Sequence, residues 1–176
     1  MIKKILKEIK PMLPVIIIYW FFASFVMANA VVPTGSMEST IMTKSRLIGN
    51  RLAYKFGTDP ERKDIIIFKA PDDKSVYYVK RIIGMPGDTV EIIQTDPDSK
   101  IGHVYINGHP INEDYLNEPM IVLEDMKFEV PENSYFCMGD NRNNSYDARY
   151  WKTHFVKKEE ITARVLFQYW NGFKTF

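Results

Sequence analysis

The sequence is poor in cysteine, in histidine and in net charge. Its single cysteine, Cys137, allows neither a disulfide within the chain nor a zinc cluster built on cysteines. The three histidines, His103, His109 and His154, have no spacing typical of metal ligands. A net charge of +1 gives no sign of nucleic-acid binding. We therefore expect no metal, no cofactor and no nucleic acid among the ligands of this protein.

A long stretch near the N-terminus lacks charge altogether, because no Asp, Glu, Lys, Arg or His lies between Lys10 and Glu38. The first ten residues, in contrast, contain four lysines and one acid. A transmembrane helix needs roughly 20 mostly apolar residues, and residues 12–32 supply them. We predict one transmembrane helix there, in the cell membrane. The positive-inside rule then places residues 1–11 in the cytoplasm and residues 33–176 in an extracytoplasmic domain.

The same stretch has an alternative interpretation as a cleaved secretory signal. Its basic start, its apolar core and the small-x-small triplet Ala28-Asn29-Ala30 are typical of such a signal. The apolar run is longer than the roughly 7–15 residues of a signal core, which favours an anchor that is retained.

Beyond residue 40 the chain consists of short runs of β-branched and aromatic residues separated by turn-forming residues, a pattern typical of strands. The pair Asn107-Gly108 between two such runs indicates a tight hairpin. No amphipathic helix of ordinary length is indicated after the apolar stretch. We predict a mainly β domain of antiparallel sheet, in which residues 95–125 form a hairpin excursion from the main body.

The segment PTGSMEST, from Pro33 to Thr40, begins just after the apolar stretch and contains a candidate nucleophile, Ser36. Gly35 before it permits a close backbone approach, and Thr34 supplies a second hydroxyl. The alternative is a linker, rich in Ser, Thr, Gly and Pro, that joins the anchor to the domain. The segment by itself is compatible with both.

A candidate base lies in the segment SVYYVKRIIG, which has the composition of a strand. With a period of two, Lys80 falls in an apolar row with Tyr78 and Ile82. Burial disfavours the ammonium form, so it lowers the lysine pKa from about 10.4 and yields a neutral amine, which is a base. The alternative is an edge lysine whose charged head reaches water along its aliphatic stem.

A polar run, MGDNRNNSYDAR from Met138 to Arg149, directly follows apolar residues. It fits either a solvated loop or a set of ion pairs and amides that orients a base. A Ser-His-Asp triad is a further alternative, but none of the three histidines lies in a segment that resembles an active site.

The apolar anchor, PTGSMEST, RLAYKFG, YYVKRIIGMPGD and MGDNRNNSYDAR, taken together and in this order, resemble the type I signal peptidases, in the short form typical of Gram-positive bacteria. The resemblance covers nearly the whole chain. It implies a membrane-bound serine endopeptidase that removes signal peptides from exported precursor proteins after small-x-small motifs such as Ala-x-Ala. Its partners would be those precursors and membrane lipid. The sequence departs from the family pattern at Ser39, where proline is common, and at Asn143, where aspartate is common.

The resemblance also implies roles for individual residues. Ser36 would be the nucleophile and Lys80 the general base of a Ser-Lys dyad without histidine. The backbone N–H of Ser36 and the hydroxyl of Thr34 would form an oxyanion hole, and Ser145 would aim the Lys80 amine. Supporting ion pairs would come from Arg81, Asp140, Arg142, Asp147 and Arg149. Shallow pockets for small substrate residues would be formed by Val32, Met37, Tyr78 and Val79.

Two other functions stay open on the sequence. A self-cleaving repressor shares the Ser-Lys chemistry, but it is soluble and carries a DNA-binding module. This chain has an apolar anchor and no helix-turn-helix segment, which argues against that function. A membrane-anchored β adaptor would use the serine loop and the polar run only as structure, and a precursor cleavage assay separates it from an enzyme.

Overall fold

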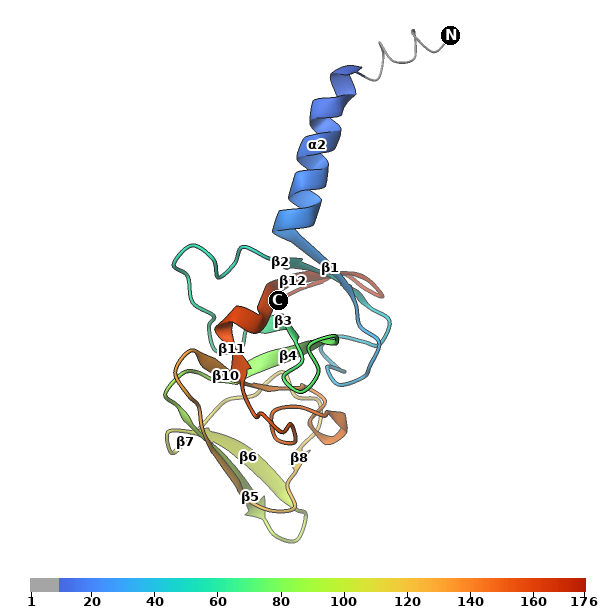
Figure 1. Cartoon of the computed structure of the whole chain (residues 1–176). Coiled ribbons are helices and arrows are strands. Elements are labelled where there is room, and N and C mark those ends of the chain that lie inside the picture. Colours follow the sequence, from blue (N-terminus) through green and yellow to red (C-terminus); the bar gives the residue numbers. More distant parts are fainter. Residues whose placement is uncertain (1–9) are drawn as a thin grey trace.

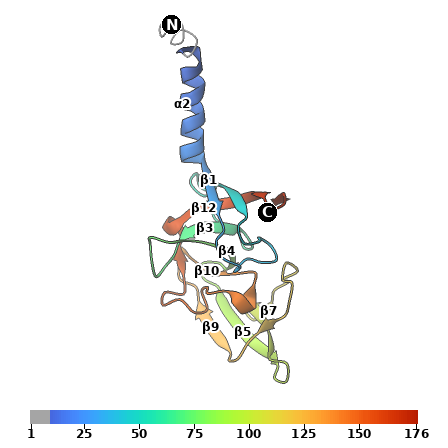
Figure 2. The same ribbon diagram turned by 90° about the vertical axis from the view of Figure 1, so that its right-hand side faces the viewer.

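The computed structural model describes residues 10–176, which form a helical N-terminal segment and a β body from which that segment projects (Figures 1 and 2). Within these residues the body consists of two sheets of eight and five strands, paired antiparallel. The fold is therefore mainly β and antiparallel, as the strand-like runs predict. Most of the predicted cytoplasmic stretch, residues 1–9 with three of its lysines, lies outside the described residues.

The N-terminal segment is helical as far as Val26 and then becomes a strand. A 3-10 turn, η1 (Lys10–Met12), leads into α2 (Leu13–Phe21) and a π-helical turn, η2 (Phe22–Val26). The strand β1 (Met27–Val31) follows directly. No helix within residues 10–176 is both long and apolar enough to cross a membrane.

The predicted helix over residues 12–32 is thus wrong at its C-terminal end, because β1 takes its place there. β1 pairs along its whole length with β2 (Arg46–Asn50). The side chain of Ala28 is buried against the body, and the amide oxygen of Asn29 accepts a hydrogen bond from the Tyr169 hydroxyl. Pairing with residues distant in the chain therefore ends the helix.

The larger sheet has the strand order β1-β2-β12-β3-β4-β10-β11, with β13 beside β12. Its further strands are β3 (Ile65–Lys69), β4 (Tyr77–Gly84), β10 (Ser134–Met138), β11 (Val156–Lys157), β12 (Ile161–Trp170) and β13 (Lys174–Thr175), and its connections contain the 3-10 turns η3 (Arg142–Asn144) and η4 (Lys158–Glu160). β4 lies between β3 and β10. An ionisable side chain on β4 therefore stands among protein atoms on both sides.

The smaller sheet has the order β7-β6-β5-β9, with β8 beside β6, and lies at the end of the body opposite α2 (Figure 1). Its strands are β5 (Thr89–Asp96), β6 (Ile101–Ile106), β7 (His109–Pro110), β8 (Met120–Ile121) and β9 (Met126–Glu129). Asn107 and Gly108 form the β6–β7 turn with φ angles of 53° and 80°, as their sequence predicts. The sheet extends over residues 89–129 and is wider than the predicted excursion over residues 95–125.

β3 is buried on both faces, which explains its uninterrupted apolar sequence. Ile66 and Phe68 on one face belong to the larger core cluster, which the smaller sheet shares. Ile65 and Ile67 on the other face belong to a second cluster that contains Met37. Met37 is fully buried, so it anchors the turn that follows β1 onto the larger sheet.

Candidate active site

Ser36 and Lys80 lie side by side, although 44 residues separate them in the chain. Ser36 is in the turn after β1, and Lys80 is in β4, opposite Ile66 of β3. The Lys80 Nζ donates a hydrogen bond of 2.5 Å to the Ser36 Oγ. Lys80 is 3% exposed and Ser36 is 9% exposed. A serine hydroxyl in contact with a lysine amine, both shielded from water, has the arrangement of a nucleophile and its base.

Burial lowers the pKa of Lys80 to about 8, because the surroundings disfavour the charged ammonium form. The carboxylate of Asp147 opposes this effect and raises the pKa, whereas the guanidinium of Arg149 lowers it further. The neutral amine, which can accept a proton, is therefore accessible close to physiological pH. Lys80 is therefore not an exposed lysine at a sheet edge, because its side chain is buried and β4 is paired on both sides.

Ser36 and Lys80 lie in the wall of a cleft of about 480 Å³, whose other walls come from the turn after β1, the start of β4 and the polar run. Three of the four residues expected to hold the substrate, Val32, Tyr78 and Val79, line this cleft together with Thr34. The fourth, Met37, lies in the core and not in the cleft wall. The structure thus places an open groove with apolar walls beside the Ser36–Lys80 pair.

Ser145 lies close to the Ser36 turn but forms no hydrogen bond with Lys80. Its Oγ is buried and has no hydrogen-bond partner within residues 10–176. A Cβ on Gly139 would stand 2.2 Å from this Oγ and 2.4 Å from the carbonyl oxygen of Ser36. We call the turn after β1 that contains Ser36 the serine turn. Only glycine therefore fits at position 139, between the polar run and the serine turn.

Two ion pairs from the polar run lie beside β4. Arg81 donates to the Asp140 carboxylate from Nε at 2.9 Å and from Nη2 at 2.6 Å. Arg149 contacts Asp147 in the same two-point manner, at 2.8 Å from Nε and 2.9 Å from Nη2. Asp147 also accepts a hydrogen bond of 3.0 Å from the Gly139 N–H. The Arg81–Asp140 pair therefore ties the polar run to β4, and the Asp147–Arg149 pair fixes the path of the run itself.

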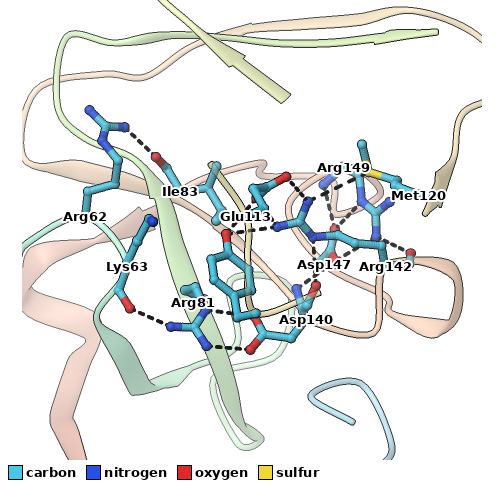
Figure 3. A network of polar contacts seen from close by, with 12 residues as sticks. Arg62, Lys63, Arg81, Ile83, Glu113, Met120, Asp140, Arg142, Asp147 and Arg149 are labelled. Carbon is cyan, nitrogen blue, oxygen red and sulfur yellow. Dashed lines mark hydrogen bonds and ion pairs between the residues drawn. The ribbon is translucent and has the colours of Figure 1, made fainter. Parts of the chain in front are cut away.

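Arg142 also forms an ion pair, and its partner is a residue that the sequence analysis missed. Its Nη1 and Nη2 donate to the two carboxylate oxygens of Glu113, at 2.8 Å and 2.5 Å. The ring of Tyr115 lies 4.1 Å from the Arg81 guanidinium, and the Tyr115 hydroxyl donates to Glu113 at 2.6 Å. Figure 3 shows Arg81, Asp140, Arg142 and Glu113 in one network. The connection between β7 and β8 supplies Glu113 and Tyr115, and no local motif marks them in the sequence.

No histidine forms a hydrogen bond with Ser36 in the described part of the chain. His154 donates from Nδ1 to the carbonyl oxygen of Ala148 at 2.6 Å, and its ring packs on Phe128. His103 and His109 are exposed on the smaller sheet. The Ser-His-Asp alternative therefore has no support in the structure.

Comparison with known proteins identifies the family. The family model described as signal peptidase, peptidase S26, matches residues 5–170. The probable signal peptidase I-2 of Synechocystis sp. is 36% identical over 166 residues, which cover 92% of this chain and 71% of that protein. The signal peptidase I P of Bacillus subtilis subsp. natto is 34% identical over 171 residues, which cover 92% of this chain and 88% of that protein. A crystal structure of a signal peptidase I from Enterococcus faecalis V583 matches with a TM-score of 0.49 and 34% identity, over 61% of this chain and 97% of that one. The chain therefore belongs to the signal peptidases of the peptidase S26 family and is a serine peptidase.

Proposed function

We propose that the chain is a membrane-anchored endopeptidase that removes N-terminal signal peptides from exported precursors, with Ser36 as nucleophile and Lys80 as general base. One observation carries the proposal: the Lys80 Nζ lies 2.5 Å from the Ser36 Oγ, and Lys80 is 3% exposed. A buried lysine can take up the serine proton at a pH at which an exposed lysine stays charged.

The reaction proceeds in two halves. In the first, the Ser36 Oγ bonds to the scissile carbonyl carbon while its proton moves to the neutral Lys80 Nζ. The resulting oxyanion collapses, the C–N bond breaks, and the Lys80 ammonium returns the proton to the leaving amine. An ester then joins the signal peptide to Ser36. In the second half, Lys80 takes a proton from water, the hydroxide attacks the ester carbon, and the proton returns to the Ser36 Oγ as the signal peptide leaves.

The oxyanion is bound by the backbone N–H of Ser36 and the hydroxyl of Thr34. Both residues line the cleft, and Thr34 is exposed there. Donors of this kind act on charge that develops only in the transition state, so they raise kcat rather than substrate affinity.

The remaining members of the predicted set keep the dyad in place. The Arg81–Asp140 pair ties the polar run to β4, the Arg142–Glu113 pair ties it to the β7–β8 connection, and the Asp147–Arg149 pair braces the run itself. The buried Ser145 Oγ, without a partner among residues 10–176, is available to the Lys80 Nζ once the Ser36 Oγ has become part of the ester. Ser145 thereby keeps the base aimed during the second half of the reaction.

The substrate binds as an extended chain in the cleft. Residues one and three before the cut then point to the same side, toward the walls that contain Val32, Tyr78 and Val79, whereas the residue between them points away. Shallow apolar walls accept alanine, glycine or serine and exclude large side chains by clash. We therefore propose cleavage after small-x-small motifs. Met37 supports the turn from the core instead of contacting the substrate.

The membrane anchor is the apolar N-terminal segment. The helical residues 10–26 project from the β body in Figures 1 and 2. The large apolar side chains from Met12 to Phe22 are 48–72% exposed. An exposed apolar surface of this kind is stable when lipid covers it. The cytoplasmic N-terminus and the extracytoplasmic body follow from the lysines that precede the segment.

The test is cleavage of a purified precursor by the full-length protein in detergent. Ser36→Ala and Lys80→Ala should each reduce kcat/KM by several orders of magnitude without changing the melting temperature by more than a few degrees. Lys80→Arg should be equally inactive, because a guanidinium keeps its proton at any usable pH. More than a few percent of residual activity in any of the three would refute the dyad. Protease added outside intact protoplasts should degrade the body and spare an N-terminal tag, and protection of the body would refute the topology.

A further inference from the structure

One residue of the polar run, Asn141, contacts the serine turn at two points, and none of the roles assigned above explains these contacts. Asn141 lies just after β10 and is half-buried. Its side-chain Nδ2 donates a hydrogen bond of 3.0 Å to the carbonyl oxygen of Gly35. Its backbone N–H donates one of 3.1 Å to the carbonyl oxygen of Ser36. The two peptide groups that flank the Ser36 Cα are therefore both held by Asn141.

The Gly35 carbonyl and the Ser36 N–H belong to the same planar peptide group. In a trans peptide the C=O and the N–H point in opposite directions, so whatever fixes one fixes the other. The Gly35–Ser36 bond is not among the cis bonds of residues 10–176. The Ser36 N–H has no hydrogen-bond acceptor within these residues. The amide of Asn141 therefore holds this peptide group from the carbonyl side and leaves its N–H free.

We propose that Asn141 is a positioning residue, whose side-chain amide aims the Ser36 N–H at the oxyanion of the reaction by holding the Gly35 carbonyl. The inference rests on the proposed function, in which that N–H stabilises the oxyanion. It assigns to Asn141 a contribution to kcat, since the oxyanion exists only along the reaction path.

The contact requires a donor at this position. A carbonyl oxygen can only accept, so Asn141 must present its NH2 group to Gly35. The Gly35 carbonyl also accepts a hydrogen bond of 3.1 Å from the Glu38 N–H, within the same turn. Removing the amide thus leaves the turn formed but loosens the orientation of its first peptide group. Aspartate has the shape of asparagine but would place a carboxylate oxygen against the carbonyl, which repels it.

The matched control lies two residues further along. Asn143 is exposed, and its side chain binds Glu118, the Pro119 carbonyl and the Ile121 N–H, on the side of the smaller sheet. It is not a wall of the cleft. Asn143→Ala therefore removes an asparagine side chain with hydrogen bonds from the same run without touching the serine turn.

The experiment compares kcat and KM of full-length wild type, Asn141→Ala, Asn141→Asp and Asn143→Ala on one precursor, with melting temperatures and pH profiles. Asn141→Ala should lower kcat about 10- to 100-fold, because loss of an aimed oxyanion donor costs about 100- to 1000-fold and here the donor is only loosened. Asn141→Asp should lower kcat further. Both should keep KM within about twofold of wild type and leave the pH midpoint in place, because Lys80 is untouched. Asn143→Ala should stay within about twofold in kcat.

A kcat of Asn141→Ala within about twofold of wild type would overturn the inference. So would a loss in Asn143→Ala equal to that in Asn141→Ala, since it would mark general damage to the polar run. If Asn141→Ala does not fold, the isosteric Asn141→Asp decides by the same criteria. Failure of the proposed function looks different, because Ser36→Ala would then cleave like wild type. An inactive Ser36→Ala beside a fully active Asn141→Ala refutes the positioning role alone.

Discussion

Replacing Lys80 by Met should stabilise the protein at neutral pH while it abolishes cleavage. The pKa of Lys80 is about 8 in the folded protein, against an ordinary value of 10.5. Below pH 8 the side chain is charged in both the folded and the unfolded chain, so the folded protein bears the whole cost of burying the charge. At about 1.4 kcal/mol for each pH unit between the two pKa values, this cost is about 3 kcal/mol at pH 7.

The sign of the pH dependence follows from the same two values. Between pH 8 and pH 10.5 the unfolded chain binds more protons at this lysine than the folded protein does, so the free energy of unfolding rises with pH in that window. Methionine has a similar volume and no charge, but it leaves the Ser36 hydroxyl without its partner, which costs about 1 kcal/mol. The net gain of Lys80→Met should be about 2 kcal/mol at pH 7 and should vanish near pH 10, where the remaining cost of the buried charge equals that of the lost hydrogen bond.

The assay is urea unfolding of the full-length protein in detergent at pH 7 and at pH 10. Lys69→Met, at an exposed position on β3, is the matched control and should change the free energy of unfolding by less than about 0.5 kcal/mol at both pH values. A Lys80→Met protein no more stable than wild type at pH 7 would refute the reasoning. A gain of the same size at pH 10 would do so too, because it would have another cause than a buried charge.

Three further outcomes are expected. The kcat/KM of the wild type should rise with pH through a midpoint of about 8, as Lys80 loses its proton, and a plateau reached near pH 6.5 would indicate a histidine base instead. Gly139→Ala should lower kcat at least 100-fold, because the new Cβ would stand 2.4 Å from the Ser36 carbonyl oxygen and must displace the turn; cleavage at the wild-type rate would show that the turn can yield. Glu113→Gln should lower the free energy of unfolding by about 3 kcal/mol, because it leaves the buried Arg142 without its carboxylate, and an unchanged urea midpoint would contradict this.

The position of Lys80 in the fold follows from local sequence rules. Alternation along SVYYVKRIIG places it in line with Ile82, and the structure buries β4 from Lys80 to Gly84. The end of the N-terminal helix does not follow from such rules. Residues 27–32, MANAVV, contain neither proline nor charge, and Asn29 is their only polar residue, so nothing local marks the end of the helix at Val26. They form a strand because their backbone pairs with β2, which lies more than ten residues further along the chain.

The partners in the three buried ion pairs could not be predicted from the sequence. Arginines and acids in MGDNRNNSYDAR indicate that pairs form, but they do not identify the partners. The Asp147 carboxylate pairs with an arginine two residues away, whereas Asp140 pairs across 59 residues and Arg142 across 29. The partner of each charge depends on which strands and loops the fold brings together. The partner of Arg142 is Glu113, which lies outside every motif.

That long-range pair has a consequence for the smaller sheet. The sequence predicts that residues 95–125 form an excursion separate from the main body. This excursion contains Glu113, whose carboxylate compensates the charge of the buried Arg142. The Arg142 Nε in turn donates to the Gly139 carbonyl, and Gly139 touches the Ser36 turn. Shortening the excursion should therefore disturb the turn that contains Ser36 through a chain of buried contacts, although the excursion contributes no residue to the walls of the cleft.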